Sequence, residues 1–277
     1  MLTQSSYGKE RIRLVQVLRR ADRDDLRDVT VAVRFDGDYG AAYTEGDNSN
    51  ILPTDTMRNT VYALAAQEAV QDIESFGLRL SQHFLAGNRC LTRVTIDLSE
   101  HHWDRIADGD REHGHAFLRR GPETRTASVS ADRDVSTVSA GAADLLILKS
   151  AESAFTGFPR DEYTTLAETR DRLLVTSLTA TWQYRDHSIP FDPTWQTVRQ
   201  TMLDAFAGHR SESVQHTLHA MGQAVLDTVD AVASIRLVMP NRHHLPFDLS
   251  RFGLENRNEI FVATEEPYGL IAATLAR

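Results

Sequence analysis

Alternating hydrophobic and polar positions predict strands in the first half of the chain. Every second residue is apolar over 29–35 and again over 94–98, and a weaker alternation over 12–14 suggests a strand before them. A period of two is typical of a strand that buries one face. Between these strands, apolar residues at helical spacing predict helices over 57–65 and 73–84.

The same order of elements recurs in the second half. Residues 145–148 and, less regularly, 178–182 predict strands, and alternation returns over 235–239. Helical spacing lies between them, over 195–206 and 214–229. Each half therefore has the order strand, strand, helix, helix, strand, with one more strand expected, which favours an α+β fold with helices on one face of an antiparallel sheet.

A Ser-, Ala- and Gly-rich stretch over 136–143 separates the two halves. We place a boundary there, which gives an N-terminal unit over 1–137 and a C-terminal unit over 138–277. The same composition fits a hairpin turn equally well.

Composition and charge limit the classes of function. A chain of 277 residues can form one large domain or two moderate ones and bury a core. The formal net charge of −9 gives an overall field that does not favour nucleic acid or an anionic membrane surface. An anionic substrate would therefore need a local cation.

Other sequence signals predict a cytoplasmic protein. Cys90 is the only cysteine, which excludes an intramolecular disulfide and a cysteine-cluster metal site. No apolar run approaches the roughly 20 residues of a membrane span. The N-terminal segment lacks the apolar core of a signal peptide, and 275–277 is not a peroxisomal tripeptide.

The stretch 145–172 has an unusual composition. An apolar strand is followed by four widely separated large side chains, those of Lys149, Phe155, Tyr163 and Arg172. The small or polar residues between them cannot form a core. Four other segments complete an ordered set of motifs: Tyr7-Gly8-Lys9, Pro53-Thr54-Asp55, Ser213-Val214-Gln215 and Pro240-Asn241-Arg242-His243.

Together these motifs resemble those of urate oxidase (uricase), a family of cofactor-independent enzymes that oxidise urate with dioxygen. The matches cover nearly the whole chain, and a set of ordered motifs is more specific than any single one. Ala151, Thr156 and Arg242 depart from the family's pattern. None of these departures removes a group that would bind substrate or relay a proton.

The resemblance implies a fold and an assembly. Its tunnelling fold (T-fold) pairs two tandem α+β units in each chain, and several chains close a barrel around a tunnel, usually as a homotetramer. Closing a barrel is one way to protect the edges of a sheet. The active sites would lie at subunit interfaces, with Lys9, Thr54 and Asp55 from one chain and the other site residues from its neighbour.

The resemblance also implies the reaction. Urate, dioxygen and water would give 5-hydroxyisourate and hydrogen peroxide, with dioxygen as co-substrate and no cofactor or metal. The sequence contains no GxGxxG, P-loop or flavin signature.

In the resemblance, Lys9, Thr54 and His243 relay the proton taken from urate. A threonine hydroxyl is too weak an acid to act alone, and Lys9 can be its base only in the neutral form. By itself, Thr54 reads as a helix N-cap and Lys9 as a solvated charge. A helix start also offers free N–H groups and a positive dipole end to an anion.

The other matched residues would bind the substrate. The planar fork of Arg172 can donate two parallel hydrogen bonds to a flat anionic heterocycle. Gln215 offers a donor and an acceptor to the urea-like edge of a purine. The resemblance adds the backbone N–H of Val214, stacking by Phe155 and a backbone contact from Asp55.

Each of these residues has a plainer interpretation. Arg172 could form a surface ion pair with Glu168 at helical i, i+4 spacing. Phe155 could be an ordinary core residue, and Asp55 a charge at a helix start.

Asn241 and His243 are expected to face the same side, because they lie two apart on an extended segment. In the resemblance, Asn241 holds dioxygen or water above the urate plane together with the threonine hydroxyl. His243 alone could be a polar residue at a strand end. His244 should face the other way, and no role is assigned to it.

Two rival functions fit the same fold. One is a metal-dependent purine or pterin enzyme, which commonly anchors the ring with a Glu where Gln215 stands here. His101, His102, His113 and His115 could bind zinc or copper, although no acidic or cysteine ligand accompanies them in a recognisable pattern. The other rival is a non-catalytic urate-binding protein, which would not need the relay residues.

Overall fold

The computed structural model describes residues 2–277, and the chain divides into two compact units. The first unit contains the residues up to Gly141 together with Gln183–Trp195. The second contains Ala142–Trp182 and Gln196–Arg277. These units are defined by packing, and the division into domains at residue 137 stays a prediction. Met1, the first residue of the predicted N-terminal domain, lies outside the described residues.

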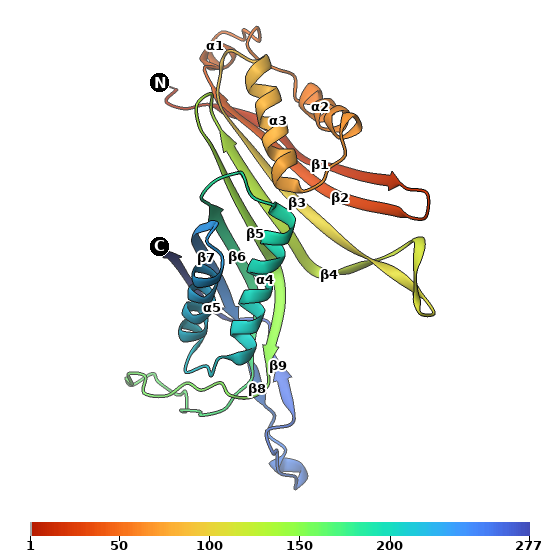
Figure 1. Ribbon diagram of the computed structural model, residues 1–277. Coiled ribbons are helices and arrows are strands. Elements are labelled where there is room, and N and C mark those ends of the chain that lie inside the picture. The colour runs from red at the N-terminus through yellow and green to blue at the C-terminus, as the bar shows by residue number, and fades with distance from the viewer. Residues whose placement is uncertain (1) are drawn as a thin grey trace. The chain divides into compact units, whose positions relative to one another are not determined.

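The first unit is an antiparallel sheet with helices on one face (Figure 1). Its strands are neighbours in chain order: β1 (Ser6–Arg19), β2 (Asp24–Gly37), β3 (Leu91–Asp108) and β4 (Arg111–Ala131). Its helices are α1 (Gly40–Thr44), α2 (Thr54–Gln67) and α3 (Ile73–Gly87). α2 packs on β1, and α3 packs on β3 and β4. The inward residues of β2, Val29, Val31, Val33 and Phe35, are at most 1% exposed.

The second unit repeats this plan. β5 (Ser136–Lys149) begins in the first unit and ends in the second, where it is followed by β6 (Leu174–Tyr184), β7 (Val232–Asn241) and β10 (Gly269–Ala276). α4 (Phe191–Gly208) also begins in the first unit, and α5 (Val214–Thr228) packs on β7 and β10. A separate ribbon pairs β8 (His244–Pro246) with β9 (Phe261–Ala263), and a short 3-10 turn, η1 (Ser250–Phe252), lies between them in sequence.

A glycine lets one helix of each unit approach its sheet closely. A Cβ on Gly77 of α3 would lie 2.7 Å from a methyl carbon of Val129. A Cβ on Gly222 of α5 would lie 2.8 Å from a methyl carbon of Leu275. Real Cβ atoms essentially never show contacts this short. Both helices therefore rest on their sheets through a position without a side chain.

A buried ion cluster lies in the first unit. Arg125, 2% exposed, forms ion pairs with Glu74 at 2.7 Å and Asp192 at 2.5 Å. Arg27 forms ion pairs with Glu100 at 2.5 Å and with Asp192 at 3.1 Å. Burial raises the pKa of the Glu74 carboxyl to about 7, although Arg125 opposes that shift. Five elements, β2, α3, β3, β4 and the start of α4, meet at this cluster.

The predicted α+β class is confirmed. The strands predicted over 29–35, 94–98 and 235–239 lie within β2, β3 and β7, and the four predicted helices correspond to α2, α3, α4 and α5. β1 and β10 are the two ends of the strand order, so the sheet of one chain is open, and the barrel of the T-fold refers to an oligomer.

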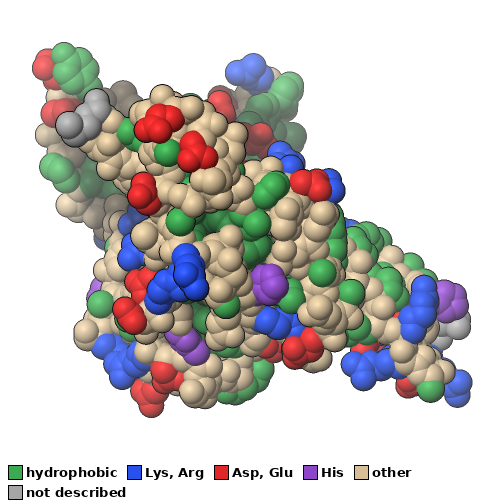
Figure 2. Space-filling view, turned by 90° about the horizontal axis from the view of Figure 1, so that it is seen from above, with side chains coloured by type: hydrophobic (Ala, Val, Ile, Leu, Met, Phe, Trp, Pro, Cys, Tyr) green, Lys and Arg blue, Asp and Glu red, His purple; other side chains and the backbone are tan. Residues whose placement is uncertain are grey.

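Two further observations concern partners. Among residues 2–277, no helix is long and apolar enough to span a membrane. On the face shown in Figure 2, acidic and basic side chains lie in small interspersed groups.

Candidate active site

The segment between β5 and β6 is irregular, yet backbone hydrogen bonds attach it to the turn before α5. The N–H of Ala154 donates to the carbonyl of Ser211 at 2.7 Å. The N–H of Ser211 donates to the carbonyl of Glu152 at 2.9 Å. Because Ser211 lies three residues before α5 begins, the segment and the helix start are held together.

Further backbone bonds fold the same segment on itself. Phe155 and Thr169 exchange two of them, at 2.8 and 3.1 Å. The N–H of Arg172 donates to the carbonyl of Ser153 at 2.8 Å. These bonds bring Phe155 and Arg172, seventeen positions apart in sequence, next to each other.

The Arg172 guanidinium lies over the Phe155 ring, with its central carbon 5.1 Å from the ring centroid. The Phe155 ring also stacks on the Phe158 ring, with ring centroids 4.9 Å apart and ring planes 14° from parallel. Arg172 is half-buried, and burial alone lowers the pKa of its guanidinium from the usual value. Its Nε is buried without a hydrogen-bond partner among residues 2–277. A half-buried guanidinium with an unpartnered Nε calls for an anionic or acceptor-rich ligand.

The structure contradicts the plain interpretation of Arg172 as half of a helical ion pair with Glu168. Residues 165–172 are not helical. The Glu168 carboxylate instead accepts a hydrogen bond from the Gly157 N–H at 3.0 Å. The guanidinium therefore stays available to a ligand.

A cavity of about 300 Å³ lies beside this pair in the second unit. Phe155 and Arg172 line it from the irregular segment, and Asn241, His243 and His244 line it from the end of β7 and the start of β8. Four of the predicted site residues therefore share one cavity. Its size lies at the lower end of the range for small-ligand sites.

The lining by His244 corrects the expectation that this residue faces away. The chain leaves β7 after Asn241, and Arg242 and His243 lie outside any strand, so alternation does not continue through them. The His244 Nδ1 lies 3.2 Å from the carbonyl oxygen of Arg242. A carbonyl can only accept, so this nitrogen carries the hydrogen.

His243 is fixed through its backbone. Its carbonyl oxygen accepts hydrogen bonds from the N–H of Thr264 at 2.9 Å and from the Thr264 hydroxyl at 3.1 Å. On its other side, the N–H of Arg242 donates to the carbonyl of Val175 at 2.9 Å. The imidazole is thereby presented from an anchored segment.

Val214 and Gln215 open α5 and are not among the residues that line this cavity. Ser213 is the N-cap, and its hydroxyl accepts from the N–H of His216 at 3.1 Å. The helical hydrogen bonds start with Thr217 donating to Ser213, which leaves the N–H groups of Val214 and Gln215 without helical acceptors. The Gln215 side chain is exposed.

Lys9, Thr54 and Asp55 belong to the first unit. Lys9 is half-buried on β1, opposite Val33 of β2 and directly before a register shift. Asp55 is exposed, and its carboxylate forms an ion pair with Arg58 at 2.7 Å. Because its carboxylate is paired, the backbone N–H is the group of Asp55 that stays available at the helix start.

The interpretation of Thr54 as an N-cap is wrong. Pro53 occupies the N-cap position, and no side chain caps the helix. Thr54 is the first helical residue, and the first helical bond runs from Met57 to Pro53 at 3.2 Å. The N–H groups of residues 54–56 thus lack helical acceptors, and the Thr54 hydroxyl is not used in capping.

A protein-family model described as Uricase matches this chain over residues 5–130 and 138–272. The chain belongs to the uricase family. The uricase of Arthrobacter globiformis is 42% identical over 277 residues, which cover 100% of this chain and 90% of that protein. The uricase of Danio rerio is 34% identical over 281 residues, covering 99% of this chain and 94% of that protein.

Solved uricases share the fold. The crystal structure of the Arthrobacter globiformis uricase covers 100% of this chain and 95% of its own, with a TM-score of 0.96 at 42% identity. A uricase from Bacillus fastidious covers 98% of this chain and 93% of its own, with a TM-score of 0.85 at 23% identity, a likeness of fold alone.

In this member of the uricase family, the histidines considered as a rival metal site contact hydroxyl, guanidinium and imidazole groups. His101 bonds the Thr30 hydroxyl at 3.0 Å and accepts from Arg119 at 2.9 Å. His113 and His115 contact each other edge to face, with ring centroids 4.4 Å apart. Among the residues that the structure describes, no group of three or more His, Cys, Asp or Glu is arranged to hold a metal ion.

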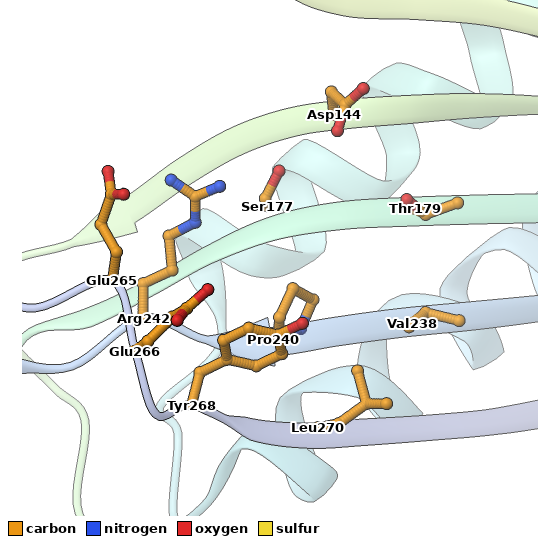
Figure 3. Close-up of a pocket in the computed structure, with 10 residues that line it drawn as sticks. All are labelled: Asp144, Ser177, Thr179, Val238, Pro240, Arg242, Glu265, Glu266, Tyr268 and Leu270. Carbon is orange, nitrogen blue, oxygen red and sulfur yellow. The ribbon is translucent and has the colours of Figure 1, made fainter.

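A larger hollow of about 410 Å³ lies on the second unit's sheet and contains none of the predicted site residues (Figure 3). Three carboxylates and one guanidinium line it: Asp144, Glu265, Glu266 and Arg242. The excess of negative charge suits an anionic purine poorly. The smaller cavity beside Arg172 is therefore the better candidate site.

Proposed function

We propose that this protein is a urate oxidase. Urate, dioxygen and water give 5-hydroxyisourate and hydrogen peroxide, so that the ring loses two electrons to dioxygen and gains one oxygen from water. The observation that carries the proposal is the unpaired Arg172 guanidinium over the Phe155 ring, in one cavity with Asn241 and His243. Membership of the uricase family and the names of its relatives support it.

The substrate-binding groups follow from their chemistry. Arg172 donates its fork to one edge of the urate anion, and the Gln215 amide meets the opposite, urea-like edge. Phe155 stacks on the ring face, and the backbone N–H groups of Val214 and Asp55 complete the contacts. Holding the ring in one orientation supplies much of the catalytic effect, because no covalent step is asked of the protein.

Lys9, Thr54 and His243 form the proton relay. Lys9 is the base that takes the proton of the Thr54 hydroxyl, which takes one from urate, and His243 passes protons on to the reduced oxygen. The free N–H groups at the start of α2 favour the negative charge that develops there. Asn241 and the Thr54 hydroxyl hold dioxygen, and later water, above the ring.

The active enzyme is a cytoplasmic homotetramer with its sites at subunit interfaces, Lys9, Thr54 and Asp55 coming from one subunit. It uses dioxygen as a co-substrate and needs no cofactor. Exposed apolar side chains on β1 and β5 support burial of these strands by other subunits, because Val15, Leu146 and Leu148 are 56%, 53% and 52% exposed.

The loss of urate's near-ultraviolet absorbance in chelator-treated buffer tests the function, with oxygen uptake and peroxide measured in parallel. Decay matched by equal oxygen uptake and peroxide is expected. Activity that disappears on chelation and returns with a metal would support a metal-dependent purine or pterin enzyme. Urate binding without any turnover would support a binding protein.

A further inference from the structure

Lysine is rare in this chain. Lys9 and Lys149 are its only lysines, so the remaining 28 of the 30 basic residues are arginine. Lysine is a compact ammonium with three rotatable donors, whereas arginine is a planar fork, and the two are not interchangeable where geometry matters. Lys9 has a role in the proposed relay. Lys149 lies outside the cavity and needs another explanation.

Lys149 is the last residue of β5, and its side chain is only 10% exposed. Its ammonium donates to the carbonyl oxygens of Ala207 at 3.3 Å, of Phe206 at 3.5 Å, and of His209. The Glu152 carboxylate is 3.8 Å away and 62% exposed, so it screens the charge weakly. The main partners of this buried cation are therefore neutral carbonyls.

These carbonyls lie at the C-terminal end of α4, where they lack helical donors and where the helix dipole favours a cation. Three acceptors converge on one nitrogen, which suits the ammonium geometry. The five donors of a guanidinium diverge in a plane and cannot all be directed to that point. This explains a lysine at 149 in a chain that otherwise uses arginine.

The position of Lys149 connects it with the candidate site. The irregular segment that carries Phe155 starts directly after it, and the turn it binds runs from His209 into α5, where Gln215 lies. Within that segment Glu152 has φ +58°, a conformation that non-glycine residues rarely adopt, so the surroundings must hold it there. Lys149 is thus at the junction of the two chain segments that present ligand-binding groups.

We propose that Lys149 is a positioning residue that clamps the α4–α5 turn to the segment 150–155, so that Gln215 and Phe155 meet a purine ring in a fixed relation. Lys149 itself does not touch the substrate. The inference rests on the proposed urate oxidase function, because it is the purine that both segments would bind.

The test compares Lys149→Met with Arg210→Met in the full-length assembled protein. Arg210 lies in the same turn, but it is exposed, and among the residues that the structure describes its side chain pairs only with Glu212. For Lys149→Met we expect the KM for urate, and the Kd for the purine xanthine, to rise by about tenfold or more, with kcat changing less. Arg210→Met should keep both constants within about twofold.

Two more variants separate positioning from simple charge. Lys149→Arg keeps the charge and should still show the raised KM. Lys149→Cys treated with bromoethylamine regains an ammonium at nearly the length of lysine and should recover the wild-type KM, with treated wild type as the control for Cys90. If Lys149→Met does not fold, the folded Lys149→Arg protein carries the comparison.

A wild-type KM in Lys149→Arg, or in a folded Lys149→Met, would overturn the positioning role. A wild-type protein that does not oxidise urate would instead overturn the proposed function. The two failures are distinguishable because the wild type is assayed first.

Discussion

At the scale of single residues, Arg172 links binding to a cost in stability. Its guanidinium is half-buried, burial lowers its pKa, and among residues 2–277 no carboxylate forms an ion pair with it. We expect Arg172→Met to lower kcat/KM for urate by about 100-fold, because a charge-assisted hydrogen bond contributes about 1.5–3 kcal/mol. The unfolding midpoint should not fall, since a buried unpaired charge is removed.

Arg170→Met is the matched control for that substitution. Arg170 is exposed and does not line the cavity, so its replacement should leave kcat/KM within about twofold. An equal loss of activity in both variants would mean that Arg172 acts through general charge rather than as a ligand.

Lys9→Met tests the relay separately from binding. Loss of a general base costs about 10²- to 10⁴-fold, so kcat should fall by orders of magnitude while urate still binds. Single-turnover absorbance decay and equilibrium binding measure the two effects. Unchanged turnover would remove Lys9 from the mechanism.

The sequence could predict which residue types meet a purine, but not all of their local partners. The choice between a free Arg172 and one paired with Glu168 depends on whether residues 165–172 are helical, and their side chains fit either case. The structure decides it through the Gly157 bond to Glu168. At Thr54, proline at position 53 took the cap position that the hydroxyl was expected to fill.

At the scale of elements, Tyr7 joins β1 to the loop that enters α2. Its hydroxyl oxygen accepts a hydrogen bond from the N–H of Leu52 at 2.8 Å. Leu52 lies two residues before Thr54, and Tyr7 lies two residues before Lys9. Tyr7→Phe leaves that donor unpaired, so the free energy of unfolding should fall by about 1–3 kcal/mol. Tyr43→Phe is the control, because its exposed hydroxyl makes one 3.3 Å bond. Denaturant unfolding measures both.

Periodicity predicted most of the elements because each half buries one face of each strand and helix. It did not predict the ribbon of β8 and β9 or the long outer part of the β3–β4 hairpin. These segments bury little on either face: Trp103, Ile106 and Leu118 of the hairpin are 37%, 45% and 66% exposed. A pattern that records burial contains little signal for strands that stand away from the core.

At the scale of the whole molecule, the cluster around Arg125 makes stability depend on pH. Burial raises the pKa of Glu74 from 4.5 to about 7, so the folded state holds this proton more tightly than the unfolded chain. Its contribution to stability is therefore fully present below pH 4.5 and is lost as the pH rises through about 7. Charge patterning could not predict this cluster, because its members are distant in sequence and such residues are usually exposed.

Glu74→Gln mimics the protonated form and should remove that dependence. We expect the thermal midpoint of the variant, relative to wild type, to rise between about pH 5 and pH 8 at one fixed protein concentration. Glu68→Gln, at a side chain that is 70% exposed, should show no such trend. Parallel curves for Glu74→Gln and wild type would contradict the assignment.

The proposed tetramer makes activity depend on concentration. Because Lys9 and Thr54 would come from a different subunit than Arg172 and His243, dilution below the dissociation range should abolish turnover while each subunit stays folded. Specific activity measured alongside light scattering over a dilution series tests this. Full activity of the isolated subunit would contradict a shared site.

The close approach of α3 and α5 to their sheets limits how this protein can be engineered. Replacing helix-interior glycine by alanine ordinarily stabilises a helix by about 1 kcal/mol, and it is a common first choice for raising heat tolerance. At Gly77 the added methyl group would lie 2.7 Å from a methyl carbon of Val129, and at Gly222 it would lie 2.8 Å from a methyl carbon of Leu275, so a side chain or the helix would have to shift at each position. A designer seeking a more durable protein should leave both glycines in place and look for alanine sites on the solvent faces of the helices.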